Sequence, residues 1–238
     1  MKAFLLAGGR GERLRPLTTS VPKCLAPING TPLLAIWLDL LVGGGVEDVL
    51  LNVSHHAEQV RAFIGRRHDG PRVHLVVEQE PIGSAGTVNA HRRFVDGEAA
   101  FWIFYADNLT NVRLAPLREF HGRHDGVLTL GLFHAPDPRA AGIVTLGETG
   151  RVVNFVEKPL VPQGDLASAG IYLARPALFE HMPRMKGVMD FGHHVLPHLV
   201  GQMYGHVIDD FLMDVGTTAS LARASAEWSN LAPAKVES

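Results

Sequence analysis

The sequence predicts an α/β protein with a Rossmann-like, mostly parallel central sheet flanked by helices. Along the first half of the chain, short continuous apolar runs alternate with segments of helical periodicity, as strands and helices do in such a sheet. The first apolar run, 3–7, stops at two glycines, which is typical of a strand buried on both faces. With 238 residues, 46% of them hydrophobic, the chain is long enough to bury a sizeable core.

The elements of the first half follow in regular order. After the strand at 3–7, a helix is expected over 31–42, because Pro32 suits the first helical turn and three glycines at 43–45 end it. The remaining expected elements of this half alternate strand and helix: 48–53, 57–67, 73–77, 86–93 and 101–105.

The alternation of expected strands and helices stops after about residue 126. Several strand candidates follow one another, at 127–133, 143–146, 152–156 and 169–173, before helical segments return near 179, at 195–200 and at 218–228. We interpret this part as a small lobe inserted on the same sheet. Because no linker or repeat separates the halves 1–125 and 126–238, we expect residues 1–238 to form one domain.

Charge and cysteine content exclude several classes of protein. The chain has 22 Lys+Arg, 24 Asp+Glu and a net charge of −2, so no global field favours a nucleic acid or a membrane surface. Cys24 is the single cysteine, and the N-terminus lacks the apolar core of a signal peptide, so a cytoplasmic setting is expected. No apolar run approaches the roughly 18 residues that a membrane span needs.

A loop rich in glycine and arginine, 8–18, follows the first strand. Backbone amides in such a loop can bind phosphate oxygens. Leu14 stands where the dinucleotide fingerprint needs a third glycine, and the Gly-Lys-Ser/Thr of a P-loop is absent, so both of these sites are excluded. A group of cations in this region would suit the charge that develops on departing pyrophosphate. These cations are Arg10, Arg13, Arg15 and Lys23.

The stretch from Gly8 to Leu34 resembles the hallmark of the sugar-1-phosphate nucleotidyltransferases, the nucleoside diphosphate sugar pyrophosphorylases. It reads GGxGxRLxPLT followed by a PK-x-L-x-P block, with Cys24 where the family usually has proline. Five further segments resemble family motifs in the same order, and Ala106 replaces a glycine in one of them. These segments are 81–86, 105–108, 156–159, 169–172 and 213–217.

The resemblance implies a nucleotide-diphospho-sugar transferase fold, which is GT-A-like. It also implies that a sugar 1-phosphate attacks the α-phosphorus of a nucleoside triphosphate in line, with Mg²⁺ and release of pyrophosphate. Residues 1–125 would then be the nucleotide-binding half and 126–238 the sugar-phosphate-binding half of one catalytic domain, with no C-terminal β-helix domain. A homodimer stays open as the assembly.

The expected catalytic residues are Arg13, Lys23 and Asp107, with the two cations on the triphosphate. Asp107 and Asp214 each follow a strand-like apolar run, and carboxylates at neighbouring strand ends of a parallel sheet converge on the ligand crevice. Two carboxylates together with substrate phosphates are a usual way of holding Mg²⁺. We therefore expect Asp107 and Asp214 to be the metal ligands.

The remaining site residues follow from the family motifs. Those expected to bind the nucleotide are Leu6, Ala7, Gly8, Gly9, Arg10, Gly11, Glu78, Gly83, Ser84 and Gly86. Those expected to bind the sugar phosphate are Asn108, Gly142, Glu157, Lys158, Ser168 and Gly170. Ser168 stands where most relatives have asparagine.

The loop 82–86 is most similar to that of guanylyltransferases that act on mannose or heptose 1-phosphate. GTP and a manno-configured hexose or heptose 1-phosphate are therefore the preferred substrates. One alternative is a uridylyl- or thymidylyltransferase for glucose 1-phosphate or for an amino-sugar or muramic acid 1-phosphate. An alternative of another class is a catalytically silent regulatory subunit that binds nucleotide-sugars. The presence of Lys23, Asp107 and Asp214 favours the enzyme.

Overall fold

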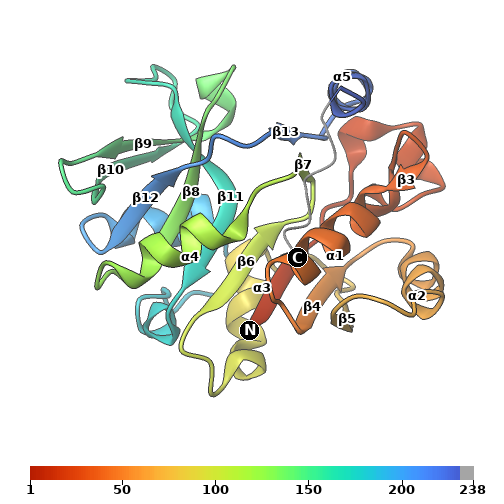
Figure 1. The fold of residues 1–238 in the computed structure, drawn as a ribbon, viewed down its shortest axis with the longest axis horizontal. Coiled ribbons are helices and arrows are strands. Elements are labelled where there is room, and N and C mark those ends of the chain that lie inside the picture. Colours follow the sequence, from red (N-terminus) through yellow and green to blue (C-terminus); the bar gives the residue numbers. More distant parts are fainter. Residues whose placement is uncertain (231–238) are drawn as a thin grey trace. The chain divides into compact units, whose positions relative to one another are not determined.

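The computed structural model describes residues 1–230 and divides the chain into two compact units (Figure 1). Unit 1 comprises Met1–Phe4, Ile82–Phe104 and Arg113–Asp209, and unit 2 comprises Leu5–Pro81, Tyr105–Val112 and the described residues from 210 onward. Both units are discontinuous in sequence, so they do not follow the boundary expected at residue 125. That residues 1–238 form a single catalytic domain stays a prediction.

Unit 2 holds the strand order β1-β4-β5, where β4 and β5 are parallel and in register from Asp48↔Arg72 to Val53↔Val77. Its two small antiparallel ribbons pair β2 with β3 and β7 with β13. The strands of this unit are β1 (Lys2–Leu6, shared with unit 1), β2 (Pro27–Ile28), β3 (Thr31–Pro32), β4 (Asp48–Val53), β5 (Arg72–Val77), β7 (Asn108–Thr110) and β13 (Leu212–Asp214). Its helices are α1 (Leu33–Gly43), α2 (Ala57–Gly65) and α5 (Thr218–Trp228).

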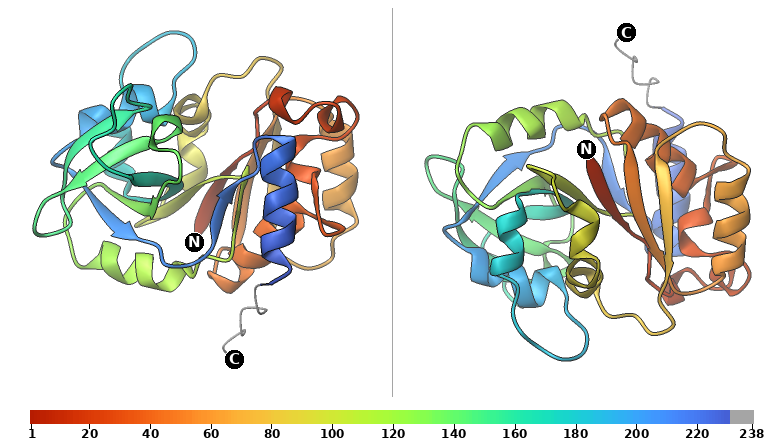
Figure 2. Two further views of the ribbon diagram at one scale, coloured as in Figure 1. Left: turned by 90° about the horizontal axis from the view of Figure 1, so that it is seen from above. Right: turned by 90° about the horizontal axis from the view of Figure 1, so that it is seen from below.

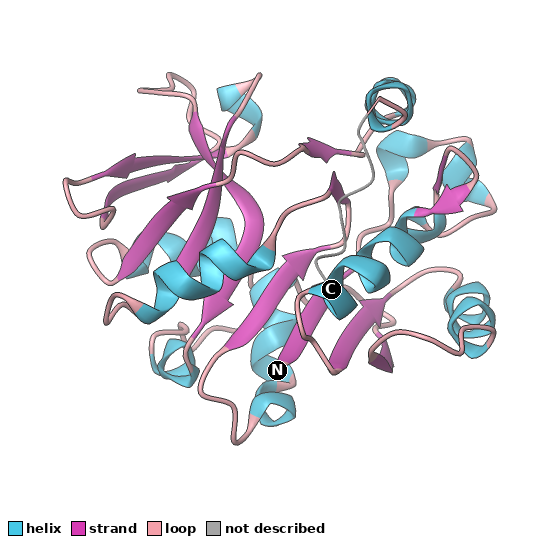
Figure 3. Cartoon of the chain, in the orientation of Figure 1, coloured by secondary structure: helices cyan, strands magenta, loops and turns pink. Residues whose placement is uncertain are grey.

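Unit 1 holds the strand order β10-β9-β11-β6-β1, with β8 paired to β11 and to β12. Strand β11 is antiparallel to β6, β8 and β9, whereas β12 is parallel to β8. The strands are β6 (Phe101–Tyr105), β8 (Leu128–His134), β9 (Gly142–Leu146), β10 (Val152–Glu157), β11 (Leu166–Ala174) and β12 (Met203–Val207). The α-helices are α3 (Ser84–Ala90) and α4 (Leu114–Gly122), and Figure 3 distinguishes helices from strands.

Several short helical turns connect these elements. Three 3₁₀ turns in the first loop region of unit 2 are Glu12–Leu14, Leu17–Thr19 and Lys23–Leu25. Those of unit 1 are Arg92–Val95, Pro138–Ala140, Pro176–Glu180 and Leu196–Leu199, together with a π-helical turn at Phe191–Val195.

Helix packing within each unit follows the apolar pattern of the sequence. In unit 2, α1 buries Leu33, Trp37 and Leu41, and α5 packs against β13 and β2. In unit 1, α4 packs against β8 and β11 (Figure 2), and the β6 residue Phe101 stacks on Phe179 with ring centroids 5.4 Å apart. Among residues 1–230, no helix combines the length and apolar character that crossing a membrane requires.

The α/β class expected from the sequence is confirmed, and the 218–228 helix has the predicted bounds. The segment expected to be helical at 195–200 contains a 3₁₀ helix, Leu196–Leu199, and no α-helix. A π-helical turn leads into a 3₁₀ turn there, because Pro197 lacks the N–H that a continuing α-helix needs. Helix α4 was not predicted. Its apolar residues are sparse, and Pro116 in its first turn masks a helix that tolerates proline there.

A pair of histidines, the buried His121 and the partly buried His124, lies where α4 meets β8 in unit 1. The Nδ1 atom of His121 lies 2.7 Å from the Thr129 hydroxyl, and Nε2 of His124 lies 2.8 Å from the same oxygen. Arg175 donates hydrogen bonds to the backbone carbonyls of both histidines. Burial, together with the Arg175 cation, lowers the pKa of His121 to about 3 and that of His124 to about 4. Both rings are therefore neutral at pH 7.

These histidines predict a loss of stability in acid. In the unfolded chain they take up protons as the pH falls below about 6.5, whereas the folded protein keeps them neutral to lower pH. Stability is thus complete above that pH and is lost as the pH falls from 6.5 toward 4. Each proton that the unfolded chain binds and the folded protein does not bind contributes a slope of about 1.4 kcal/mol per pH unit to the free energy of unfolding.

Urea unfolding at pH 7, 6 and 5 measures this slope. The variant His121→Gln, which keeps a hydrogen-bonding group for Thr129, is expected to flatten the slope, whereas His198→Gln at an exposed position should leave it unchanged. An unfolding free energy of the parent that is equal at pH 7 and pH 5 would contradict the prediction.

Candidate functional site

The arginine-rich loop of unit 2 is built around Gly11. This residue has φ 65°, in the left-handed region that favours glycine, and it begins the 3₁₀ turn that carries Arg13. The Thr18 hydroxyl donates a 2.7 Å hydrogen bond to the Gly11 carbonyl. A β-carbon added at Gly11 would lie 3.2 Å from the β-carbon of Lys23, so the loop backbone passes directly beside the base of that lysine side chain.

Lys23 and Asp107, both predicted to be catalytic, form an ion pair. Their Nζ and Oδ2 atoms are 2.9 Å apart, with the lysine side chain 11% exposed and the carboxylate 39% exposed. Folding of unit 2 therefore brings together residues that are 84 positions apart. The neighbouring Cys24 is buried, and burial raises the pKa of its thiol to about 12, which disfavours the reactive thiolate.

Asp214 lies on a segment next to Asp107 because of a strand pairing that the sequence did not predict. The two aspartates were expected at the ends of neighbouring parallel strands, and this expectation was wrong. Asp214 ends β13, which pairs antiparallel with β7 in a separate ribbon, opposite Asn108. The Val215 N–H donates to the Asp107 carbonyl at 2.9 Å. The two aspartates therefore lie on adjoining backbone segments because of ribbon pairing.

Arg13 lies beside Asp214. The Asp214 Oδ1 and Arg13 Nη2 atoms lie 2.7 and 2.9 Å from the point that a β-carbon at Gly216 would occupy. The guanidinium and the carboxylate therefore approach the backbone of the same glycine. Arg13, Lys23, Asp107 and Asp214 thus form two adjoining cation–carboxylate sets in unit 2.

The donor set of Asp107 and Asp214 fits a hard divalent cation. Carboxylate oxygens are ligands that Mg²⁺ prefers, and Mg²⁺ is commonly held by one or two carboxylates plus phosphates and water. Within residues 1–230, no group of three or more His, Cys, Asp or Glu residues could hold a metal. A metal at these two aspartates would therefore need oxygen ligands from a bound phosphate or from water.

A buried polar cluster joins the first loop of unit 2 to Glu78. Asn52, on β4, accepts a hydrogen bond from the Ala7 N–H at 2.9 Å and donates one to the Glu78 carboxylate at 3.1 Å. The Ser54 hydroxyl donates to the Gly8 carbonyl at 2.7 Å. Asn52 was not among the predicted site residues, although one buried asparagine within the apolar strand DVLLNV is a signal that the sequence contains.

The other predicted nucleotide-binding residues of unit 2 lie in the same loop. Leu6 is the last residue of β1 and accepts a hydrogen bond from the Ala106 N–H at 3.0 Å. Gly9 is exposed, and Arg10 forms a 3.6 Å ion pair with Glu80. The structure thus brings residues 6–11 and the segment 78–80 together within unit 2.

Gly83, Ser84 and Gly86 belong to unit 1, where they contact the segment 189–191. The Gly86 N–H donates to the Met189 carbonyl at 2.9 Å. The Ser84 hydroxyl donates to Asp190 at 2.8 Å and accepts from the Phe191 N–H at 2.9 Å. Their assignment to the nucleotide stays a prediction, and the structure shows that this loop supports the segment 189–191.

The Glu157 carboxylate in unit 1 lies in a slot between the backbones of Gly142 and Gly192, and a side chain at either glycine would collide with it. A β-carbon would lie 2.7 Å from its Oε2 atom if added at Gly142, and 2.4 Å if added at Gly192. Burial raises the pKa of the Glu157 carboxyl, with Asp190 adding to the rise and Lys158 opposing it. The Lys158 Nζ lies 3.7 Å from the other carboxylate oxygen. Gly192 was not among the predicted residues.

Unusual backbone conformations mark the other sugar-side residues of unit 1. Lys158 has φ 46°, in the left-handed region that is strained for a residue with a side chain. Gly170 has φ 67° and lies where the β11–β8 register shifts between Ser168 and Tyr172, whose hydroxyls are 3.0 Å apart. Asn108 lies in unit 2, so the structure does not group it with these residues inside one unit.

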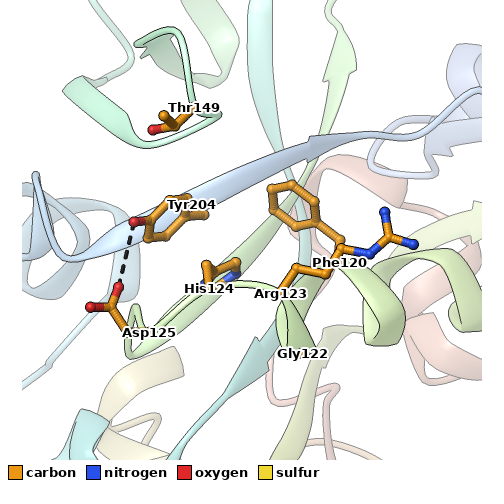
Figure 4. A pocket seen from close by; sticks show the side chains of 7 residues that line it. All are labelled: Phe120, Gly122, Arg123, His124, Asp125, Thr149 and Tyr204. Atoms are coloured by element: carbon orange, nitrogen blue, oxygen red, sulfur yellow. Dashed lines mark hydrogen bonds between the residues drawn. The ribbon is translucent and has the colours of Figure 1, made fainter.

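A cavity of about 630 Å³ lies elsewhere in unit 1, at the end of α4 (Figure 4). Its lining residues are Phe120, Gly122, Arg123, His124, Asp125, Thr149 and Tyr204. The His124 ring stacks on Tyr204 at 4.0 Å, and the Tyr204 hydroxyl donates to Asp125 at 3.5 Å. Arg123 forms an ion pair with Glu119. These side chains already have protein partners, so the cavity carries no functional assignment.

Comparisons with known proteins identify the family of this chain. The family model described as nucleotidyl transferase matches residues 2–230. Mannose-1-phosphate guanylyltransferase from Mycobacterium tuberculosis is 33% identical over 230 residues, which cover 94% of this chain and 64% of that protein. Glucose-1-phosphate thymidylyltransferase from Streptomyces griseus is 38% identical over 186 residues, covering 76% of this chain and 51% of that protein.

A solved structure shows the same fold. It is a Bacillus anthracis protein assigned as a glucose-1-phosphate thymidylyltransferase in complex with sucrose, with a TM-score of 0.88 at 24% identity over 99% of this chain and 98% of that chain. The chain spans less than two thirds of the length of the Mycobacterium and Streptomyces relatives. Because the family model matches nearly all described residues, this chain belongs to the nucleotidyl transferase family, among the sugar-1-phosphate nucleotidyltransferases.

Proposed function

We propose that this chain transfers a nucleoside monophosphate from a triphosphate to a sugar 1-phosphate and releases pyrophosphate in a Mg²⁺-dependent reaction. The observation that carries the proposal is the 2.9 Å pair of Lys23 and Asp107, with Asp214 on the adjoining backbone segment. These residues supply the cation and the carboxylates that transfer of a charged phosphoryl group demands. A silent regulatory subunit is less favoured because all three of these residues are present.

The chemistry requires charge compensation more than proton transfer. A sugar phosphate is already ionised near neutral pH, so no general base has to activate it. Lys23 would exchange its contact with Asp107 for a phosphate oxygen of the triphosphate, and Arg13 would bind the pyrophosphate portion through its planar guanidinium. Mg²⁺, when bound, would neutralise phosphate charge, and Asp107 and Asp214 are the residues that would hold it.

We assign the sugar 1-phosphate to unit 1. Lys158 offers a compact charge to the phosphate, and Glu157 offers carboxylate oxygens to sugar hydroxyls. The slot between Gly142 and Gly192 fixes where that carboxylate lies. The strained backbone at Lys158 supports this assignment, because such conformations persist mainly where function requires them.

The preferred nucleotide is GTP, with a manno-configured hexose or heptose 1-phosphate as the acceptor. Glu78 supports this preference, because an ionised carboxylate only accepts hydrogen bonds and guanine presents two neighbouring N–H donors, on N1 and N2. Uracil and thymine present one N–H between two carbonyl oxygens, which a carboxylate repels. The second candidate is thymidylyl transfer to glucose 1-phosphate, and the resemblance to the Streptomyces griseus enzyme favours it.

A panel assay tests the activity and the nucleotide preference together. The chain is incubated with Mg²⁺, each of GTP, ATP, CTP, UTP and dTTP, and a set of sugar 1-phosphates, and pyrophosphate release is followed through a coupled pyrophosphatase. We expect the highest kcat/KM with GTP and mannose or heptose 1-phosphate. No turnover with any pair would refute the enzyme, and turnover with dTTP or UTP alone would refute the guanylyl preference.

Substitutions at the cation–carboxylate set test the mechanism. Lys23→Ala is expected to lower kcat by about 10² to 10³-fold, as loss of a charge-stabilising donor typically does. Asp107→Asn and Asp214→Asn should each raise the Mg²⁺ concentration needed for half-maximal activity. Thermal unfolding should change little in Lys23→Ala, whose remaining carboxylate is 39% exposed, whereas Asp107→Asn should lower the unfolding temperature because it takes the carboxylate from a lysine that is 11% exposed.

The exposed residue Asp96 provides the matched control, since Asp96→Asn removes the same charge elsewhere on the chain. We expect parental kinetics from this control. Parental Mg²⁺ dependence of Asp107→Asn would remove that residue from the metal site.

The glycine slot predicts a selective effect on the sugar substrate. In Gly192→Ala the new methyl group would displace the Glu157 carboxylate, so KM for the sugar 1-phosphate should rise by about tenfold while KM for the triphosphate stays near that of the parent. Gly164→Ala is the matched control, because a β-carbon there meets nothing within 4 Å. Equal changes in both KM values, or none, would contradict the assignment of Glu157 to the sugar.

A further inference from the structure

The side chain of Asn52 makes two hydrogen bonds that the pairing of strand β4 in the sheet does not require. It is a 4% exposed polar residue on β4, a strand whose other residues are mostly apolar and buried. Its amide uses both ends: Oδ1 accepts from the Ala7 N–H at 2.9 Å and Nδ2 donates to Glu78 Oε2 at 3.1 Å. One side chain thus joins the glycine-rich loop to the carboxylate that follows β5.

The backbone around this side chain is already fixed by the sheet. Strands β4 and β5 are in parallel register, with Val53 opposite Val77, and the Glu78 N–H donates to the Val53 carbonyl at 2.8 Å. The position of the Glu78 main chain therefore does not depend on Asn52. What the hydrogen bond from Asn52 determines is the rotation of the Glu78 carboxylate about its own side-chain bonds.

Close packing at Gly8 holds the Asn52 amide in place. A β-carbon at Gly8 would lie 2.6 Å from Asn52 Nδ2 and 3.4 Å from Glu78 Oε2, so the amide and the carboxylate both lie against the backbone of this residue. Any larger residue at position 8 would collide with the Asn52 amide. The loop backbone, the amide and the carboxylate therefore form one packed group within unit 2.

We propose that Asn52 is a positioning residue for base selection, because it orients the Glu78 carboxylate toward the nucleobase. The inference rests on the proposed function, in which Glu78 accepts hydrogen bonds from the base. Asn52 occupies Oε2 through its amide nitrogen, which fixes the plane in which Oε1 lies. A carboxylate without this donor would lose one contact that restricts its rotamers.

An exchange of donor and acceptor between the two residues tests the proposal. Asn52→Asp keeps the size of the side chain and the acceptor for Ala7 but removes the donor to Glu78. Glu78→Gln alone allows the new amide to turn its N–H₂ group toward the base. The double variant Asn52→Asp with Glu78→Gln restores one hydrogen bond in the reverse direction and keeps the charge of the pair. It also leaves the carbonyl oxygen of the new amide where Oε1 of Glu78 lay.

Steady-state kinetics are measured with the triphosphate that the parent turns over fastest and with each competing triphosphate. Each single variant should raise KM for that triphosphate by about 10 to 100-fold, the range that corresponds to a hydrogen bond with a charged group, with kcat changed much less. The double variant should have a KM clearly below that of Glu78→Gln and recover part of the discrimination between bases, because the orienting hydrogen bond is restored although the acceptor that faces the base is now a neutral carbonyl oxygen.

Two outcomes would overturn the inference: a double variant whose KM is no lower than that of Glu78→Gln, or an Asn52→Asp variant whose KM lies within about twofold of the parent. If Asn52→Asp fails to fold, the comparison of Glu78→Gln with the double variant still carries the test. Asn154→Asp, at an exposed position on β10, is the control for the added charge.

The test separates this inference from the proposed function. Absence of turnover by the parent would refute the proposed activity. Turnover by the parent combined with a double variant that is not rescued would refute only the role of Asn52. Urea unfolding of the four proteins measures the coupling of the pair in stability without any substrate, and we expect the two substitutions to be non-additive.

Discussion

The contact between Lys23 and Asp107 is the interaction on which the proposed chemistry depends. A substrate with several negative charges needs a cation at its phosphates, and an isolated ammonium group that is 11% exposed would be costly to keep charged. The Asp107 carboxylate stabilises that charge in the free protein. The same carboxylate is a suitable metal ligand, so in the proposed reaction it would bind the metal once a phosphate oxygen replaced it as the partner of Lys23.

Close backbone approach is the second constraint on the site. The Glu157 carboxylate in unit 1 lies between two glycines, and the Asn52 amide in unit 2 lies against a third, so in both units a polar side chain contacts backbone that comes nearer than a larger residue would permit. This arrangement explains why small changes at Gly192 should act on one substrate and leave the other unaffected.

The sequence motifs predicted which charged residues belong to the candidate site. The arrangement of these residues depends on tertiary contacts that the sequence does not reveal. The sequence motifs pointed to Lys23 and Asp107, and the structure places them in contact. The route by which Asp214 arrives was not predictable, because a three-residue ribbon pairing across about a hundred positions leaves no periodic signal. Gly192 was also missed, since its role depends on a tertiary contact with Glu157.

The similarity of the chain to both guanylyl- and thymidylyltransferases has a physical explanation. Phosphate transfer requires the same cations and carboxylates with either base, so residues such as Lys23 and Asp107 do not distinguish the two activities. Discrimination between bases requires groups that match the donors and acceptors of one base edge. In the proposed function Glu78 is that acceptor, and its hydrogen bond with Asn52 would make base preference depend on a residue that does not itself contact the base.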